Sequence, residues 1–390
     1  MHNESIVFTV FLIFSGAAVV STAVLYTRQS LLVAYILLGM LIGPWGLKWV
    51  SDITMVQEVG DVGILFLLFL LGLHLQPQNL FHMLKNVTWV ALLSSLVFFA
   101  LGYFVGLAFN YSNTECLVIG ASLMFSSTII GLKLLPTTIL HHQHTGEVMI
   151  SVLLMQDLIA IIVLILLKGA SNADGLSWQD IVGVIGALPA LVIFAFLVEK
   201  FVLIKLLAKF DTTKEYVFLL SVGWCLGLAQ FATLMHLSED IGAFVAGVSL
   251  AASPISLYIA ESLKPLRDFF LVMFFFSIGA TFNFSYATAV IVPAMILAVL
   301  ILIIKPLLYW GLLYRTGENK QVSLEVGVRL GQASEFSLLV AALALTTAMI
   351  SIKAANLIQA TTILTFIASS YIVVLRYPTP IALTDKMRKD

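Results

Sequence analysis

The sequence predicts an all-α integral membrane protein with about thirteen transmembrane helices. Hydrophobic residues make up 61% of the 390 residues and charged residues only 11%, whereas soluble proteins carry about a quarter charged residues. The mean hydropathy is +1.06. The apolar residues also come in runs of about 20, which is the length that a helix needs to cross a bilayer. Together these observations exclude a soluble globular class.

Each run predicts one span. The segment MHNES before the first run has no Lys or Arg and no small-residue cleavage site, so we expect that run to be a retained helix rather than a signal peptide. The expected spans lie near residues 6–25, 31–49, 57–76, 87–109, 115–135, 147–168, 180–206, 215–236, 239–253, 266–282, 286–313, 322–348 and 355–376.

The loop charges predict the orientation of these spans. Most of the 20 Lys and Arg residues fall in loops on one side, and only Lys48, Lys168 and Lys353 fall on the other. By the positive-inside rule the N-terminus lies outside and the C-terminus lies in the cytoplasm. The formal net charge of -1 gives no indication of a nucleic-acid partner, because the basic residues lie in short clusters between apolar runs.

Two spans contain small polar residues where an unbroken helix would be apolar. These are Ser126, Ser127 and Thr128 in the fifth span and residues 331–335 (GQASE) in the twelfth. Six spans, a linker helix near 180–206 and six further spans form an inverted repeat, which pairs the fifth span with the twelfth. A broken helix leaves backbone groups without partners, so both breaks must be buried in protein or line a watery cavity.

The sixth span carries Gln156 and Asp157 near its midpoint. A carboxylate at that depth costs several kcal/mol unless something pairs with it. Two interpretations follow: a functional site, or a structural bridge to a neighbouring helix. Lys305 and Arg329 also fall within spans and are candidates for partners of such a carboxylate.

Seven motifs occur in the order and spacing of the cation:proton antiporter-2 family, which the chain resembles over all its spans. The Gln156-Asp157 pair resembles the potassium/proton branch, typified by the glutathione-gated potassium efflux antiporters. The motifs are LIGPWGL (41–47), GILFLLFLLGLHL (63–75), FSSTII (125–130), LLMQDLIAI (153–161), GAFVAGVSLA (242–251), IIKP (303–306) and GQASEFSLLV (331–340).

The resemblance implies a sodium/proton antiporter-like fold with two crossing broken helices in the inner cell membrane. Core and scaffold subdomains are then interleaved within residues 1–376, and the scaffold makes a homodimer contact. Two departures stand out: His74 occupies a position where relatives carry an acidic residue, and residues 377–390 form only a short cytoplasmic tail. The nucleotide-binding domain of the potassium efflux members is not present, so its counterpart is either part of a longer protein or a separate regulator. No cofactor is expected.

The chemistry of exchange suits Asp157. A group that holds either a cation or a proton can exchange one for the other, since burial disfavours the charged carboxylate and a bound cation favours it. We expect a monovalent cation at Asp157, with potassium favoured over sodium. The other expected ion-binding residues are Gln156, Ser126, Ser127 and Thr128, whose oxygens replace part of the hydration shell. Because a neutral Gln156 stands where a second acid would allow two protons, we expect one-for-one, electroneutral exchange.

Three charged residues are expected charge partners. The resemblance places Lys305 near Asp157, although a lysine stem could instead extend to the cytoplasmic surface. Glu335 sits near mid-membrane, where it could complement the helix ends or pair with Arg329. A structural role is the preferred interpretation for Glu335.

Rival classes are weaker. A channel filter would need a TVGYG-type loop, and an intramembrane aspartyl protease would need two mid-membrane Asp residues, so the protein is not expected to be an enzyme. A sodium-coupled organic solute symporter stays open. His141, His142 and His144 lack a metal-site context and are best interpreted as a solvated loop, with pH sensing as an alternative. Four Gly pairs (39/43, 102/106, 223/227 and 327/331) predict close helix packing.

Overall fold

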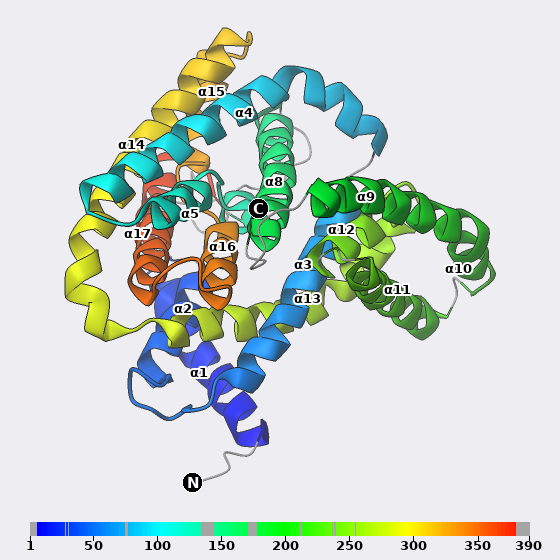
Figure 1. The fold of residues 1–390 in the computed structure, drawn as a ribbon, viewed down its shortest axis with the longest axis horizontal. Coiled ribbons are helices and arrows are strands. Elements are labelled where there is room, and N and C mark those ends of the chain that lie inside the picture. The colour runs from blue at the N-terminus through cyan, green and yellow to red at the C-terminus, as the bar shows by residue number, and fades with distance from the viewer. Residues whose placement is uncertain are drawn as a thin grey trace. The chain divides into compact units, whose positions relative to one another are not determined.

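The regular elements of the protein are helices, as the composition predicts (Figure 1). The structure, a computed structural model, describes residues 6–27, 29, 31–74, 77–133, 144–170, 178–210, 213–235, 237, 239–253 and 255–379. His141, His142 and most of the predicted tail lie outside the described residues, and so does the side chain of His74. Within the described residues, seven helices are long and apolar enough to cross a membrane.

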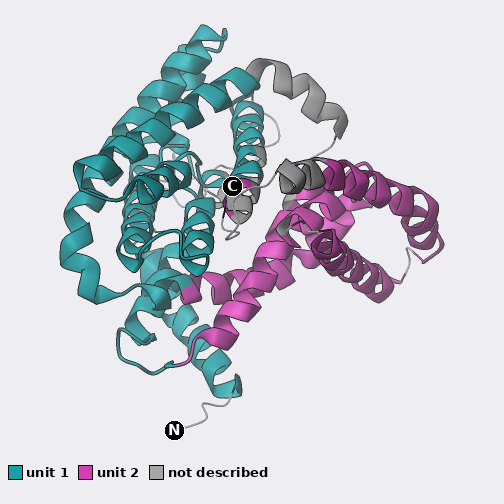
Figure 2. Ribbon diagram, in the orientation of Figure 1, with its two compact units in different colours: residues 1–51, 83–164, 278–390 teal, residues 52–82, 165–277 magenta. Residues whose placement is uncertain are grey.

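The chain divides into two compact units that are interleaved in sequence (Figure 2). Unit 1 comprises residues 1–51, 83–164 and 278–390, and unit 2 comprises residues 52–82 and 165–277. The predicted division into interleaved core and scaffold subdomains stays a prediction.

Unit 1 holds the two predicted breaks. Its helices are α1 (Ile6–Tyr26), α2 (Leu31–Ile42), most of α4 (Pro77–Ala108), α5 (Asn113–Leu123), α6 (Thr128–Lys133), most of α8 (His144–Ala170), the 3-10 turn η2 (Phe284–Tyr286), α14 (Ala287–Arg315), α15 (Lys320–Arg329), α16 (Glu335–Thr346) and α17 (Ile352–Arg376). Within this unit α5 packs on α16, and α14 packs on both α15 and α17.

Unit 2 is formed by α3 (Thr54–His74), α9 (Trp178–Val198), the π-helical turn η1 (Glu199–Leu203), α10 (Ile204–Phe210), α11 (Lys214–Leu234), α12 (Glu239–Leu250) and most of α13 (Ser256–Thr281). In it α12 packs on both α3 and α11. The predicted linker helix near 180–206 corresponds to three consecutive helical elements, α9, η1 and α10, with no break between them.

Two expected boundaries are wrong. The second expected span was too long, because α2 ends at Ile42, where Gly43 and Pro44 stop the helix. The loop expected between 253 and 266 is helical from Ser256 onwards, with Pro265 inside α13. A proline removes one helical hydrogen bond but does not prevent the helix from continuing when packing supports it.

Most of the predicted Gly contacts are present. A Cβ on Gly102 would come within 2.9 Å of Gly120, and one on Gly106 within 2.9 Å of the Cys116 sulfur, so α4 and α5 approach closely. A Cβ on Gly327 would lie 2.6 Å from the Pro306 carbonyl oxygen, which holds α15 tightly on α14. The prediction is wrong for Gly223 and Gly227 within the described part of the chain, because no described atom lies within 4 Å of a Cβ added to either.

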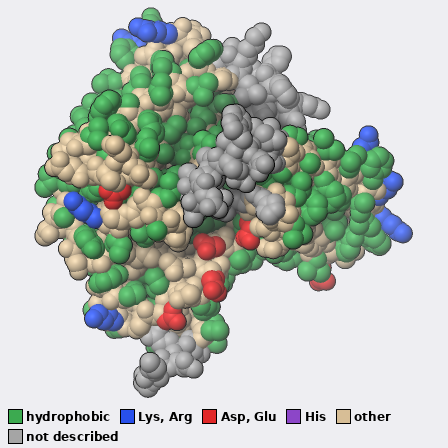
Figure 3. All heavy atoms as spheres, viewed as in Figure 1, with side chains coloured by type: hydrophobic (Ala, Val, Ile, Leu, Met, Phe, Trp, Pro, Cys, Tyr) green, Lys and Arg blue, Asp and Glu red, His purple; other side chains and the backbone are tan. Residues whose placement is uncertain are grey.

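The surface matches the membrane class. Figure 3 shows hydrophobic side chains over most of the visible surface of the described residues, with the charged groups in small clusters. Large apolar side chains are among the most exposed, for example Trp89 at 75% and Leu234 at 77%. Soluble proteins rarely expose apolar area on this scale, whereas a bilayer covers it. The chain is therefore a multi-pass membrane protein.

Candidate functional site

Both predicted breaks are present, and each ends in a serine that caps the next helix. Residues 124–127 separate α5 from α6, and residues 330–334 separate α15 from α16. The Ser127 hydroxyl accepts a hydrogen bond from the Ile130 amide at 3.1 Å, and the Ser334 hydroxyl accepts one from Phe336 at 3.1 Å. Serine is a preferred N-cap, so the local sequence itself restarts each helix. Thr128 and Glu335 therefore open the following helices instead of lying in the breaks.

The two breaks touch each other. The Ser126 hydroxyl donates to the Leu330 carbonyl at 2.8 Å, and the side-chain amide of Gln332 donates to the Ser127 carbonyl at 3.3 Å. The rings of Phe125 and Phe336 meet edge to face with centroids 6.5 Å apart. Backbone groups freed by one break are thus satisfied by the other, as burial inside a membrane demands.

Asp157 lies in α8 beside the first break and is only 2% exposed. The Thr128 hydroxyl donates to its two carboxylate oxygens at 3.4 and 3.3 Å. These contacts are longer than usual O–H···O bonds, so they engage the carboxylate weakly. The buried carboxylate of Glu335 interacts with it electrostatically. The structure therefore brings Asp157, Thr128 and Glu335 together, as two acids and one hydroxyl.

Lys305 links the two breaks by donating hydrogen bonds to a backbone carbonyl in each. It is 0% exposed, and its Nζ donates to the Phe125 carbonyl at 2.5 Å, the Gln332 carbonyl at 3.0 Å and the Ser126 hydroxyl at 3.3 Å. The same Nζ lies 4.8 Å from the centroid of the Phe98 ring. An ammonium has three donors, so these acceptors use all of them.

Two consequences follow for Lys305. A fully buried, bound ammonium does not extend to the cytoplasmic surface, so that alternative is wrong. Among the contacts that the structure describes for Lys305, the partners of the ammonium are break carbonyls and Ser126, and the predicted pairing with Asp157 stays a prediction. Carbonyls at helix C-termini carry partial negative charge, and a cation there stabilises them.

Gln156 is bound on three sides. Its amide nitrogen donates to the Tyr309 hydroxyl at 2.6 Å and to the Met124 carbonyl at 3.2 Å, and its oxygen accepts from the Ser126 amide at 3.1 Å. Tyr309 is not among the residues predicted from the sequence. The sequence signal that could have identified it is its place four residues after Lys305 on α14, because residues at that spacing share a helix face.

Arg329 is placed outside this cluster of contacts. Its side chain is buried, pairs with Glu325 at 2.8 Å, and donates to the Pro378 carbonyl at 3.0 Å. Its guanidinium carbon also lies 5.3 Å from the centroid of the Tyr377 ring. Glu325 precedes Arg329 by four residues, a spacing that places both on one face of a helix. The sequence-based prediction considered Glu335 and not Glu325 as the partner of Arg329.

His144 is the one described member of the histidine loop. Its ring nitrogens lie 3.3 Å from Glu147 and 2.7 Å from a Glu318 carboxylate oxygen. In the part of the chain that the structure describes, no three His, Cys, Asp or Glu side chains gather as a metal site.

Comparisons with known proteins agree with this architecture. The chain is 31% identical to K(+) efflux antiporter 5 of Arabidopsis thaliana over 324 residues, which cover 79% of the chain and 56% of that relative. It is 29% identical to K(+) efflux antiporter 6 of the same plant over 352 residues, covering 87% of the chain and 58% of the relative. The chain thus spans a little over half the length of these curated relatives.

A solved structure shares the fold. The sodium proton antiporter MjNhaP1 from Methanocaldococcus jannaschii matches with a TM-score of 0.71 at 17% identity, covering 94% of this chain and 95% of the other. The family model described as the transmembrane sodium/hydrogen exchanger matches residues 10–375. By that match the chain belongs to the sodium/hydrogen exchanger family.

Proposed function

We propose that this protein is a secondary active antiporter that exchanges a monovalent cation, potassium in preference to sodium, for a proton. Asp157 holds the cation and the proton in turn as the site opens to one side of the membrane and then to the other. The family match and the names of the plant relatives support this proposal. The homodimer, the outside N-terminus and the location in the cell membrane are parts of the same proposal.

The observation that carries the proposal is a buried carboxylate beside a helix break, weakly bound by a hydroxyl. Asp157 is 2% exposed, and Thr128 approaches its oxygens at 3.3 Å or more. Burial of a carboxylate favours the protonated form, and a desolvated cation at the same oxygens favours the ionised form. Binding of one therefore expels the other, which is the coupling that exchange requires.

The proposed stoichiometry is one cation for one proton. The residue beside Asp157 in sequence is Gln156, whose amide is neutral and already bound to Tyr309, Met124 and Ser126. Glu335 is the acid that could add a second proton, since it interacts electrostatically with Asp157. We propose that it instead has a structural role and keeps one protonation state throughout the cycle.

The test is cation-driven dissipation of an imposed pH gradient in proteoliposomes, with potassium, sodium, lithium and rubidium added in turn. We expect exchange with potassium in the wild type and at least a 100-fold loss in Asp157→Asn, because an amide cannot release a proton. Asp268→Asn is the matched control, since that exposed carboxylate pairs with Arg267 and belongs to unit 2, whereas both breaks belong to unit 1.

Four results would count against the proposal. Exchange that persists in Asp157→Asn would refute the role of Asp157, and a response to sodium alone would move the protein to sodium/proton exchange. A cation-driven current across the vesicle membrane would refute the one-for-one ratio. A wild type that takes up an organic solute with sodium, without moving protons, would identify a symporter.

A further inference from the structure

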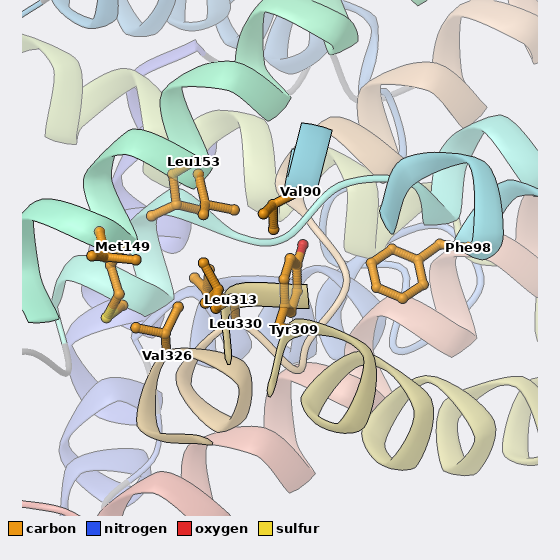
Figure 4. Packing of buried hydrophobic residues seen from close by; sticks show 10 residues of the cluster. Val90, Phe98, Met149, Leu153, Tyr309, Leu313, Val326 and Leu330 are labelled. Atoms are coloured by element: carbon orange, nitrogen blue, oxygen red, sulfur yellow. The ribbon is translucent and has the colours of Figure 1, made fainter. Parts of the chain in front are cut away.

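Tyr309 is a fully buried residue with a polar group that the proposed exchange does not use. Its ring belongs to a cluster of buried hydrophobic side chains and meets Phe98 edge to face, with centroids 5.7 Å apart. Figure 4 shows this ring beside Phe98, Leu313 and Leu330, with the hydroxyl oxygen at its tip. A buried hydroxyl costs free energy unless it is hydrogen-bonded, so the partners of this one call for a reason.

Ser94 on α4 is one of those partners, and the other two belong to the elements that carry the proposed exchange site. The Tyr309 hydroxyl accepts a hydrogen bond from the Gln156 amide at 2.6 Å and lies 3.4 Å from the Ser126 hydroxyl. Gln156 immediately precedes Asp157 on α8, and Ser126 lies in the first break. One hydroxyl on α14 thus reaches both elements that form the cation site.

The network fixes which way the Gln156 amide points. Its nitrogen faces the Met124 carbonyl and its oxygen faces the Ser126 amide. Turning the amide over would place two acceptors against each other at Met124 and two donors against each other at Ser126. Three of the four hydrogen bonds that a Gln side chain can make are therefore already used inside the protein.

We infer that Tyr309 is a positioning residue: through Gln156 it holds the Asp157 turn of α8 against the first break and so sets the dimensions of the cation site. Gln156 then acts through its position and is not a principal cation ligand. The inference rests on the proposed exchange at Asp157. It gives the Tyr309 hydroxyl a role that packing does not explain, because Phe would fill the same space.

The first experiment replaces only the hydroxyl, in Tyr309→Phe, and measures potassium/proton exchange in proteoliposomes. We expect the apparent KM for potassium to rise roughly fivefold to tenfold, and the preference for potassium over sodium to change, while the maximal rate per folded protein stays within about twofold. Tyr314→Phe is the matched control, because that tyrosine lies on the same helix and is 57% exposed. Its KM should equal that of the wild type.

A purely structural role predicts a different result. Tyr309→Phe would then lower the melting temperature and the yield of folded protein but leave the KM and the ion preference unchanged, and that outcome would overturn the inference.

The second experiment asks whether the hydroxyl acts through Gln156. Gln156→Met keeps the shape of the side chain but removes its amide, and we expect the same rise in KM. Because both changes break one linkage, the double variant Tyr309→Phe with Gln156→Met should match Gln156→Met alone. A double variant whose KM rises by the product of the two single effects would overturn the inference.

Gln156→Met also tests the inference if Tyr309→Phe fails to fold. An unchanged KM in Gln156→Met refutes the proposed role of the Tyr309–Gln156 hydrogen bond. A wild type without exchange activity would refute the proposed function itself, which is a separate result.

Discussion

The two helix breaks look alike in sequence but are held in different ways. The first break is tied to α8 and α14, through Gln156 on the Ser126 amide and Lys305 on the Phe125 carbonyl. The second is tied to α17, because Thr365 accepts from the Ala333 amide at 3.1 Å and Ser369 donates to the Gln332 side chain at 3.0 Å. Both breaks share Lys305.

The side-chain hydroxyls that follow the two breaks also have different partners. After the first break, Thr128 directs its hydroxyl to Asp157. After the second, the Ser337 hydroxyl is used to close the cap of α16 on the Ser334 amide and to donate to the Ser122 carbonyl of α5. In the proposed exchange site the first break therefore has a binding role through Thr128, and the Ser337 hydroxyl after the second break has an anchoring role. Changes at the first should alter ion affinity, and changes at the second should alter stability.

Lys305→Met should have the largest effect, since it removes the group that both breaks share. The Phe125 and Gln332 carbonyls would lose their cationic donor inside the protein, which costs about 2–4 kcal/mol and abolishes exchange. Thermal unfolding in detergent and exchange in proteoliposomes measure the two effects. Lys264→Met is the control, because that exposed lysine pairs with Glu261. A Lys305→Met protein with wild-type stability and activity would show that the breaks do not depend on the ammonium.

Thr128→Val should affect transport without affecting stability. The substitution keeps the shape of the side chain but removes the hydroxyl that approaches Asp157, so we expect the apparent KM for potassium to rise roughly fivefold. Thr128→Ser should restore the affinity. In the control Thr346→Val the lost hydroxyl donates to the Leu343 carbonyl of its own helix. An unchanged KM in Thr128→Val would remove the first break from the cation site.

Ser337→Ala should show the reverse pattern and the smallest effect. The Ser122 carbonyl and the Ser334 amide each lose a partner, which lowers the free energy of unfolding by about 1 kcal/mol while the KM stays as in the wild type. Ser221→Ala provides the comparison, since that buried hydroxyl donates to a carbonyl of its own helix. Should Ser337→Ala change ion affinity instead of the melting temperature, the division between a binding break and an anchoring break would be wrong.

The position of the breaks could be predicted because small polar residues interrupt apolar runs that are otherwise long enough to span a bilayer. The burial of Asp157 followed from its place in such a run. The serine caps could also have been predicted from the local sequence, although Ser127 was predicted as a break residue and an ion ligand and not as a cap.

The partners of Lys305, Gln156 and Tyr309 could not be predicted in the same way. Lys305 contacts carbonyls 180 and 27 residues away, and backbone carbonyls carry no residue-specific signal in a sequence. Tyr309 reaches Gln156 over a separation of 153 residues. These contacts depend on how α14 packs on the junction of the breaks, which periodicity and composition do not determine.

The ammonium of Lys305 has a mechanical consequence. It is bonded to one carbonyl in each break, just beyond the ends of α5 and α15, while its own stem belongs to α14, so one ammonium links three helices. Sliding any one of them past the others would break a buried, charge-assisted hydrogen bond. We therefore expect the exchange site to travel as a rigid block, with the movement of alternating access taking place at the margins of that block and not within it.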